Sequence, residues 1–176
     1  MISRKHKKNE SRKITMIPST NPYAEGSVEV YFGNTKVIVT ASVSDEPPKW
    51  LKGKSGEFER GWITAEYGML PRSTHSRNKR EASSGKQGGR TMEIQRLIGR
   101  AMRASISDKD IPGLLITIDC DVVIADGGTR TAAISGAWVA LCHAINSYLI
   151  NKNVHTKINI KQIAAISAGI IDGEAM

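Results

Sequence analysis

The sequence predicts an α+β fold in which helices pack on a mixed β-sheet. Alternating apolar residues on either side of Gly33-Asn34 indicate a β-hairpin, and an apolar run over residues 114–125 indicates a strand buried on both faces. Two longer segments have the apolar spacing or the small residues of packed helices. Along the chain the order is strand, strand, loop, helix, strand, helix, strand, which is typical of helices layered on a sheet.

The opening hairpin is predicted within residues 26–44. Its inward-facing positions are apolar on both sides of the tight turn: Val28, Val30, Phe32, Val37, Val39 and Ala41. Residues 45–80 do not continue this alternation and are rich in prolines, glycines and charged residues. One short strand is predicted there, at residues 61–69. Long ordered loops are usually functional, so we expect this one to contribute to function.

An amphipathic helix is predicted to follow, with Arg90 at its start. One face is apolar (Ile94, Leu97, Ile98, Ala101 and Met102), and the other is charged (Glu93, Arg96, Arg100 and Arg103).

The predicted buried strand at residues 114–125 ends at Gly127-Gly128. A second helix is expected over residues 129–149, with a small-residue face that allows close approach to the sheet (Ala133, Gly136, Ala137 and Ala140). Residues 162–171 are predicted to be the last strand, and "DGEAM" the turn after it. Because such a turn should return the backbone to the sheet, we expect Met176 to be a truncation point of a single domain over residues 1–176 that lacks its C-terminal part.

The formal net charge of +8 is concentrated in two segments. Residues 1–13 carry six Lys/Arg against one Glu, and residues 71–103 carry nine against two acidic residues. Concentrated basic charge favours polyanions, so nucleic acid is the leading class of partner, ahead of an anionic membrane surface. The basic N-terminal segment, residues 1–20, is part of this pattern; a solvated charged face is the alternative interpretation.

Composition also excludes several classes of protein. The basic N-terminus lacks the apolar segment of a signal peptide, and no apolar run comes near the length of a membrane span, so no membrane partner is expected. Cys120 and Cys142 have neither disulfide-framework nor metal-ligand spacing and are expected to be small buried hydrophobes in a reducing, cytoplasmic environment.

Two glycine-rich helix starts carry an arginine each, in "GKQGGRTME" and "ADGGTRTAA". A helix start presents unpaired N–H groups and partial positive charge, and a guanidinium beside it favours phosphate. Two such starts facing one another would hold one tetrahedral anion. The sequence has no nucleotide P-loop motif and no GxGxxG motif.

These residues also carry a family resemblance. "GWITAEYGMLPRSTHSRNKREA", "KQGGRTMEIQRLIGRAMRA" and "ITIDCDVVIADGGTRTAAISGAWVAL" resemble ribonuclease PH, and the likeness runs from about residue 25 to residue 175. The resemblance implies a fold like domain 2 of ribosomal protein S5. It also implies a phosphate-dependent 3′-to-5′ exoribonuclease that trims transfer RNA precursors and releases nucleoside diphosphates. The assembly it implies is a hexameric homo-oligomer, a ring built as a trimer of dimers.

The resemblance assigns roles to individual residues. Arg90 matches the arginine that holds the attacking phosphate, and Gly128, Thr129 and Arg130 match the family's phosphate-binding turn. An arginine-rich loop matches the segment used for RNA contact and ring assembly: Arg72, Arg77 and Arg80. Inorganic phosphate is therefore the expected co-substrate.

The resemblance departs at the C-terminus. The family's Mg²⁺ is held by two aspartates that follow the "DGEA" turn, and this sequence ends before reaching them, so no metal ligand is assigned. Asp119, Asp121 and Asp126 are the substitutes at hand, although they match structural positions. Two rival functions stay open: a catalytically silent RNA-binding subunit of a ring, and a small-molecule phosphotransfer enzyme.

Overall fold

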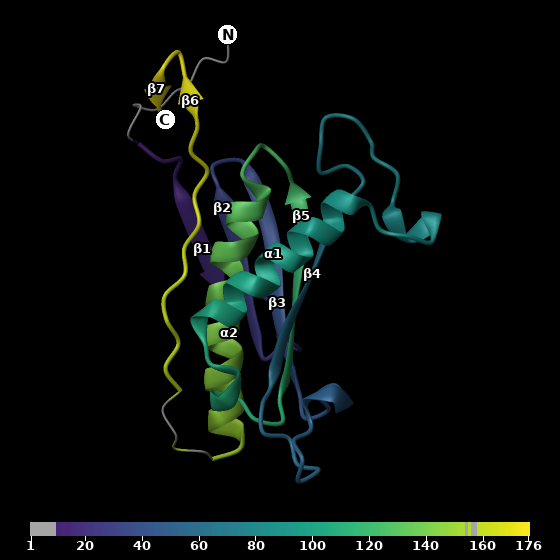
Figure 1. The fold of residues 1–176 in the computed structure, drawn as a ribbon. Coiled ribbons are helices and arrows are strands. Elements are labelled where there is room, and N and C mark those ends of the chain that lie inside the picture. Colours follow the sequence, from purple (N-terminus) through teal and green to yellow (C-terminus); the bar gives the residue numbers. More distant parts are fainter. Residues whose placement is uncertain (1–9, 154, 156–157) are drawn as a thin grey trace.

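The computed structural model describes residues 10–153, 155 and 158–176. A five-stranded sheet carries two long helices on one face, as Figure 1 shows. The predicted α+β fold is confirmed. The expectations that concern residues 1–9 lie outside the described residues.

The sheet contains β1 (Ile14–Pro18), β2 (Gly26–Phe32), β3 (Thr35–Ser44), β4 (Trp62–Met69) and β5 (Leu115–Ile124). Their order across the sheet is β1-β2-β3-β5-β4. Neighbouring strands are antiparallel except β4 and β5, which are parallel and are connected through the first long helix, so the sheet is mixed. The predicted hairpin and the strand near residues 61–69 are confirmed. The strand predicted over residues 114–125 is confirmed as an interior strand of the sheet, but only one of its faces is buried.

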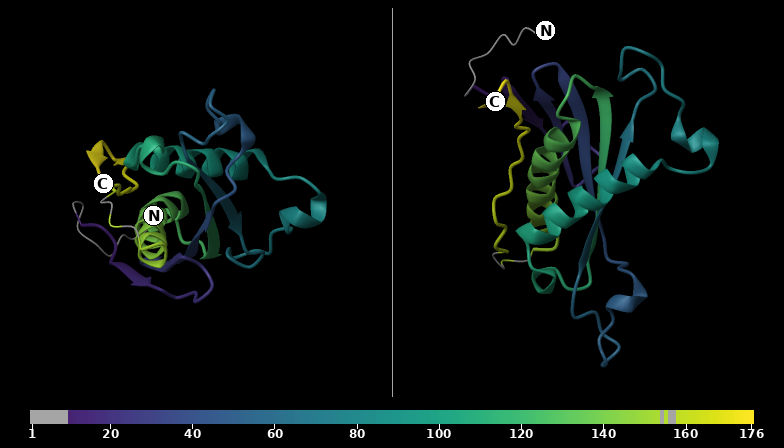
Figure 2. Two further views of the ribbon diagram at one scale, coloured as in Figure 1. Left: turned by 90° about the horizontal axis from the view of Figure 1, so that it is seen from below. Right: turned by 45° about the horizontal axis from the view of Figure 1, so that its top comes forward.

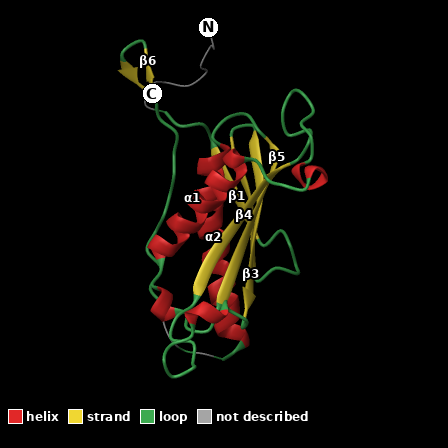
Figure 3. Cartoon of the chain, turned by 45° about the vertical axis from the view of Figure 1, so that its right-hand side comes forward, coloured by secondary structure: helices red, strands yellow, loops and turns green. Residues whose placement is uncertain are grey.

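The two long helices are α1 (Gly89–Ser105) and α2 (Thr129–Asn151). Figures 2 and 3 show both on the same side of the sheet, where α1 packs mainly on β4 and α2 on β2 and β3. Alternate residues of β2, β3, β4 and β5 are buried beneath them, and the face of α1 with Ile94, Ile98 and Met102 is fully buried. Three short 3-10 helices lie in the connections: Lys49–Leu51, Glu81–Ser84 and Asp108–Asp110.

Small residues let α2 approach the sheet closely. A side-chain carbon at Gly136 would stand 2.5 Å from Val30 Cγ2, and one at Gly26 of β2 would overlap the Ala140 carbonyl oxygen. Ala133, Ala137 and Ala140 are fully buried as predicted. The contact therefore depends on the absence of side chains on both elements.

Contrary to the expectation that no segment approaches the length of a membrane span, α2 is long and apolar enough to cross a bilayer by length and composition alone. Half of its most apolar stretch is buried within the structure, where it packs on β2 and β3. Helices in the cores of globular proteins commonly meet the same criteria.

The predicted strand at residues 162–171 is wrong for most of its length. The segment is extended but forms a strand only at β6 (Ile170–Ile171), which pairs with β7 (Glu174–Ala175) across the predicted turn. Before β6 its backbone bonds to the helices: Trp138 Nε1 donates to the Lys161 carbonyl at 2.8 Å, and Ala165 N–H donates to Ser135 Oγ at 3.1 Å. Figure 1 shows it running beside α2.

Three further details differ from expectation. The edge strand β1 was not predicted, because five residues ending in a proline show little alternation. Arg103 was expected on the solvent side of α1, yet its guanidinium lies 4.5 Å from the Trp62 ring centroid and donates to the Ile63 carbonyl at 2.7 Å. Cys120 is buried as expected, whereas Cys142 is half-buried; burial raises the pKa of both thiols.

Candidate functional site

Both long helices begin at a glycine that leaves the first backbone N–H groups open. The N-cap residues of α1 and α2 are Gly88 and Gly128, neither of which has a side chain to cap its helix. Neither helix has an acidic residue in its first turn. Each start therefore presents open donors and the positive end of the helix dipole.

The structure brings the two helix starts together. Arg130 Nη1, in the first turn of α2, lies 3.5 Å from Oε1 of Glu93, in the second turn of α1. This pair is exposed and hence weak, so an anion can replace the Glu93 carboxylate as the partner of Arg130. Arg90 is exposed at the start of α1.

Tyr67 of β4 contacts the start of α2 and lies within electrostatic range of Arg90 and Arg130. Burial raises the pKa of its hydroxyl, while Thr129 as hydrogen-bond partner and the charges of Arg90 and Arg130 act in the opposite direction. Both guanidiniums are thus close enough to influence one buried phenol. The Tyr67 hydroxyl donates to Thr129 Oγ1 at 2.9 Å, so the buried Thr129 hydroxyl keeps its own proton to donate.

The turn before α2, residues 126–128, is tied to the N-terminal strands. Gly127 and Gly128 have φ values of +80° and +69°, a backbone conformation that favours glycine. The Asp126 carboxylate accepts a hydrogen bond from Asn34 Nδ2 at 3.0 Å. Buried Thr35 accepts from the Asp126 N–H at 2.9 Å and donates to the Gly127 carbonyl at 2.6 Å.

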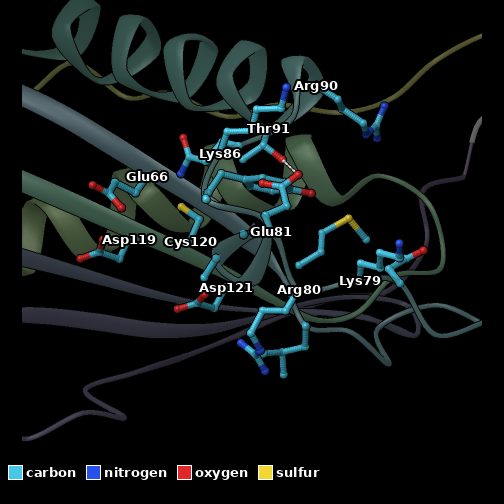
Figure 4. A pocket seen from close by; sticks show the side chains of 18 residues that line it. Glu66, Lys79, Arg80, Glu81, Lys86, Arg90, Thr91, Asp119, Cys120 and Asp121 are labelled. Carbon is cyan, nitrogen blue, oxygen red and sulfur yellow. Dashed lines mark hydrogen bonds between the residues drawn. The ribbon is translucent and has the colours of Figure 1, made fainter.

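A pocket of about 630 Å³ lies beside β4, between the loop before α1 and the start of that helix. Figure 4 shows Arg90 and Thr91 on one side of it and Arg80 on the other. Glu81 fixes the loop to the helix, because its Oε1 accepts from Thr91 Oγ1 at 2.8 Å. Arg90, which was predicted to bind phosphate, and Arg80, from the loop predicted to contact RNA, therefore line the same pocket.

Three acidic side chains of the sheet also line the pocket, from the face opposite the helices. Glu66, Asp119 and Asp121 alternate with the buried, helix-facing Tyr67 and Cys120, and Glu66 is directly opposite Asp119 in register. Burial raises the pKa of Asp119, and the charges of Glu66 and Asp121 raise it further. Burial also raises the pKa of Asp121, against the opposing charge of Arg80.

These carboxylates do not fit a metal site at the helix starts. Asp119 and Asp121 face away from Thr129 and Arg130, and the Asp126 carboxylate is bonded to Asn34. Among the described residues, no group of three or more His, Cys, Asp or Glu is arranged to hold a metal ion.

The remaining arginines of the predicted RNA loop are placed differently from Arg80. Arg72 is exposed and donates to the His75 carbonyl of its own loop at 3.0 Å, and Arg77 is exposed. Neither lines the pocket.

Sequence reasoning missed the residues that support the site. Tyr67, Glu93, Thr35 and Arg12 all contact the helix starts or the 126–128 turn. The inward position of Tyr67 in the strand pattern was the one available signal, because it places a hydroxyl beneath the helices.

Known proteins share features of this sequence and this fold. The model of the "3′ exoribonuclease family, domain 1" matches residues 10–145. Rice (Oryza sativa) Rrp46 has a similar structure, with a TM-score of 0.72 at 20% identity over 98% of this chain and 70% of that one.

Two archaeal structures are also similar. A chain of the Archaeoglobus fulgidus exosome with RNA bound to the active site gives a TM-score of 0.70 at 18% identity, over 97% of this chain and 67% of that one. A chain of an archaeal exosome core gives 0.66 at 17% identity, over 95% and 63%. This chain therefore spans about two thirds of the length of the chains that it resembles, and the likeness at these identities concerns the fold.

Proposed function

Because this chain belongs to the RNase PH family of 3′ exoribonucleases through its first domain, we propose that it acts in phosphate-dependent removal of nucleotides from RNA 3′ ends. The observation that carries the proposal is the meeting of two uncapped helix starts, with Arg90 and Arg130 both near Tyr67. Two guanidiniums, a hydroxyl donor and open N–H groups suit a small tetrahedral anion. The 3′ ends of transfer RNA precursors are the proposed substrate.

The proposed reaction is phosphorolysis. An oxygen of inorganic phosphate, held by Arg90, Arg130 and the Thr129 hydroxyl, forms a bond to the phosphorus of the last phosphodiester. The bond from that phosphorus to the 3′ oxygen of the preceding nucleotide breaks, and this oxygen takes up a proton equivalent to the one that the attacking hydrogen phosphate loses. The products are a nucleoside diphosphate and an RNA shortened by one nucleotide. The side chains contribute position and charge neutralisation, which are the main requirements of phosphoryl transfer.

Mg²⁺ is the metal that the family resemblance implies, and the described carboxylates do not fit it at this site. No step of the proposed reaction is therefore assigned to a metal held by Asp119, Asp121 or Asp126.

The basic loop before α1 is the proposed contact for the RNA backbone. Arg80 lines the pocket on the side opposite Arg90, while Arg72 and Arg77 are exposed on the same loop. We propose that the loop also forms contacts between copies of the chain in a hexameric ring. Sedimentation of the purified chain at micromolar concentration should then give species larger than the 19.2 kDa monomer, and a monomer alone would contradict the ring.

A second candidate function is an RNA-binding ring subunit that holds phosphate and RNA but turns over slowly. It is favoured by the position of Asp119 and Asp121 on the sheet face away from the helix starts. Under this alternative RNA binds in a salt-dependent manner, while nucleoside diphosphate release is very slow.

The two candidates are separated by assay of a 3′-tailed transfer RNA precursor with and without inorganic phosphate. The first candidate predicts nucleoside diphosphates that appear only with phosphate. It also predicts a rate about 100-fold lower in Arg90→Ala and Arg130→Ala, the scale for loss of one electrostatic contact to the reacting centre. Arg96→Ala, which removes the same charge from the exposed side of α1, is the control and should keep the wild-type rate. RNA binding without phosphate-dependent release would favour the second candidate.

A further inference from the structure

The carbonyl side of the 126–128 turn is held by a guanidinium from the N-terminal segment. Arg12 Nη1 donates to the Asp126 carbonyl at 2.7 Å, and Arg12 Nη2 donates to the Gly127 carbonyl at 3.1 Å. The Thr35 hydroxyl donates to the same Gly127 carbonyl at 2.6 Å. Two consecutive carbonyls are therefore fixed by one rigid fork and one buried hydroxyl.

This arrangement sets the direction of the next N–H groups. In a trans peptide unit the C=O and the following N–H point in opposite directions within one plane. Fixing the carbonyls of Asp126 and Gly127 toward Arg12 therefore directs the N–H groups of Gly127 and Gly128 away from it. Because both glycines have positive φ and many other conformations open to them, the turn needs such ties to hold one geometry.

Arg12 is packed closely into this position. A side-chain carbon at Gly128 would stand 2.6 Å from Arg12 Nη2, and one at Gly33 of the hairpin turn would stand 3.1 Å from Arg12 Cδ. Because Gly33 and Gly128 have no side chains, they leave room for the aliphatic part and the guanidinium of Arg12, respectively. Two of its N–H groups are used on carbonyls, so its role differs from that of Arg90 and Arg130.

We infer that Arg12 is a positioning residue for the phosphate site: it holds the 126–128 turn so that Gly128, Thr129 and Arg130 meet the anion in the binding geometry. The inference rests on the proposed function, since it concerns the same site. It assigns one residue of the basic N-terminal segment to site geometry and not to RNA binding.

The test measures inorganic phosphate binding to the full chain by calorimetry, with Arg12→Ala, Arg12→Lys and Lys13→Ala. Arg12→Ala should weaken phosphate binding about tenfold, because misplaced binding groups lose much of their effect. Arg12→Lys should recover part of the loss, because an ammonium reaches a carbonyl without the fork geometry. Lys13 is exposed and adjacent, so Lys13→Ala removes the same charge and should bind within about twofold of wild type.

Backbone amide resonances give a second readout that general destabilisation would not produce. Arg12→Ala should shift the signals of Gly127 and Gly128 and leave those of β4 unchanged, in a chain whose circular dichroism matches wild type. If Arg12→Ala is too unstable to measure, the partial loss in Arg12→Lys carries the test.

The outcomes separate this inference from the proposed function. Equal phosphate affinity in Arg12→Ala and wild type, with a loss in Arg130→Ala, would overturn the inference and leave the proposed function standing. An equal loss in Arg12→Ala and Lys13→Ala would assign the effect to charge alone and also overturn it. Absence of phosphate binding in the wild-type chain would remove the proposed function, and the inference with it.

Discussion

Asp119 and Asp121 are carboxylates that the fold makes harder to ionise. Both belong to β5, on the sheet face opposite the helices, where burial is the main cause of their raised pKa values. Arg80 offsets the effect at Asp121, whereas Asp119 faces the additional charges of Glu66 and Asp121.

Asp119→Asn should stabilise the folded chain at neutral pH. The folded pKa of Asp119 lies above its ordinary value of 3.8, so the folded state binds more protons and stability falls as pH rises through the folded pKa. Asparagine does not ionise, so it avoids the free energy that the folded chain loses when it holds a charged carboxylate at this position. The gain should stay below about 1 kcal/mol, because the side chain is only half-buried and solvent screens it.

Urea unfolding of wild type and Asp119→Asn between pH 4 and pH 8 measures this difference. The gain should be largest at neutral pH and shrink toward the acid end, where the wild-type carboxylate is increasingly protonated. Asp110→Asn, an exposed carboxylate in a 3-10 helix, is the control for loss of a charge. A gain that grows as the pH falls would contradict the argument.

At the scale of elements, the packing of α2 on β2 depends on Gly26. A side-chain carbon there would overlap the Ala140 carbonyl and stand 2.7 Å from Ala144 N, and backbone atoms of a helix cannot move aside as side chains do. Gly26→Ala should therefore lower the free energy of unfolding by about 2 to 3 kcal/mol, the range for overpacked sites.

Gly89→Ala is the matched control, because a side-chain carbon at this position in α1 has no heavy atom within 4 Å among the described residues. It should raise the free energy of unfolding by about 0.5 kcal/mol, since alanine reduces the freedom of the unfolded chain. Chemical denaturation compares the two variants, and similar changes in both would show that the α2–β2 contact is looser than described.

The elements that sequence could predict are those specified by local pattern. The β2–β3 hairpin and α1 repeat an apolar spacing within their own residues, β5 is an apolar run, and α2 has a face of small residues. Residues 162–169 are mostly apolar, as a buried strand is, but extended chain that lies on a helix has a similar composition. Hydrogen bonds between Ala165 and Ser135, and from Trp138 to the Lys161 carbonyl, hold this segment on α2. Local spacing contains no information about such partners.

For the candidate site, too, only the residues marked by a local pattern could be predicted. Arg90, Thr129 and Arg130 could be singled out because each follows a glycine-rich helix start. Arg12 and Thr35 could not, because 115 and 92 residues separate them from Gly127, whose carbonyl they hold. Contacts between segments that are distant in sequence could not be predicted from local sequence patterns.

At the scale of the whole molecule, the net charge of +8 should make RNA binding depend on salt. Each phosphate neutralised on single-stranded RNA contributes about 0.7 to the slope of log affinity against log salt concentration. If Arg80 contacts the RNA backbone, Arg80→Ala should reduce the slope by about this amount. Lys109→Ala, which removes an exposed charge from a 3-10 helix distant in sequence from the basic loop, should leave the slope unchanged.

Fluorescence anisotropy of a short labelled RNA from 50 to about 300 mM salt measures both slopes. Identical slopes for wild type and Arg80→Ala would place the RNA path elsewhere on the chain.

The order of strands has a consequence for synthesis on the ribosome. The interior strand β3 is complete at Ser44, yet its second partner, β5, begins only at Leu115, after β4 and α1 have been made. A two-stranded hairpin is marginal in water, and an open strand edge invites pairing with other chains. The nascent chain therefore exposes one edge of its future core until the ribosome has translated β5. Protection by a chaperone matters most during that interval.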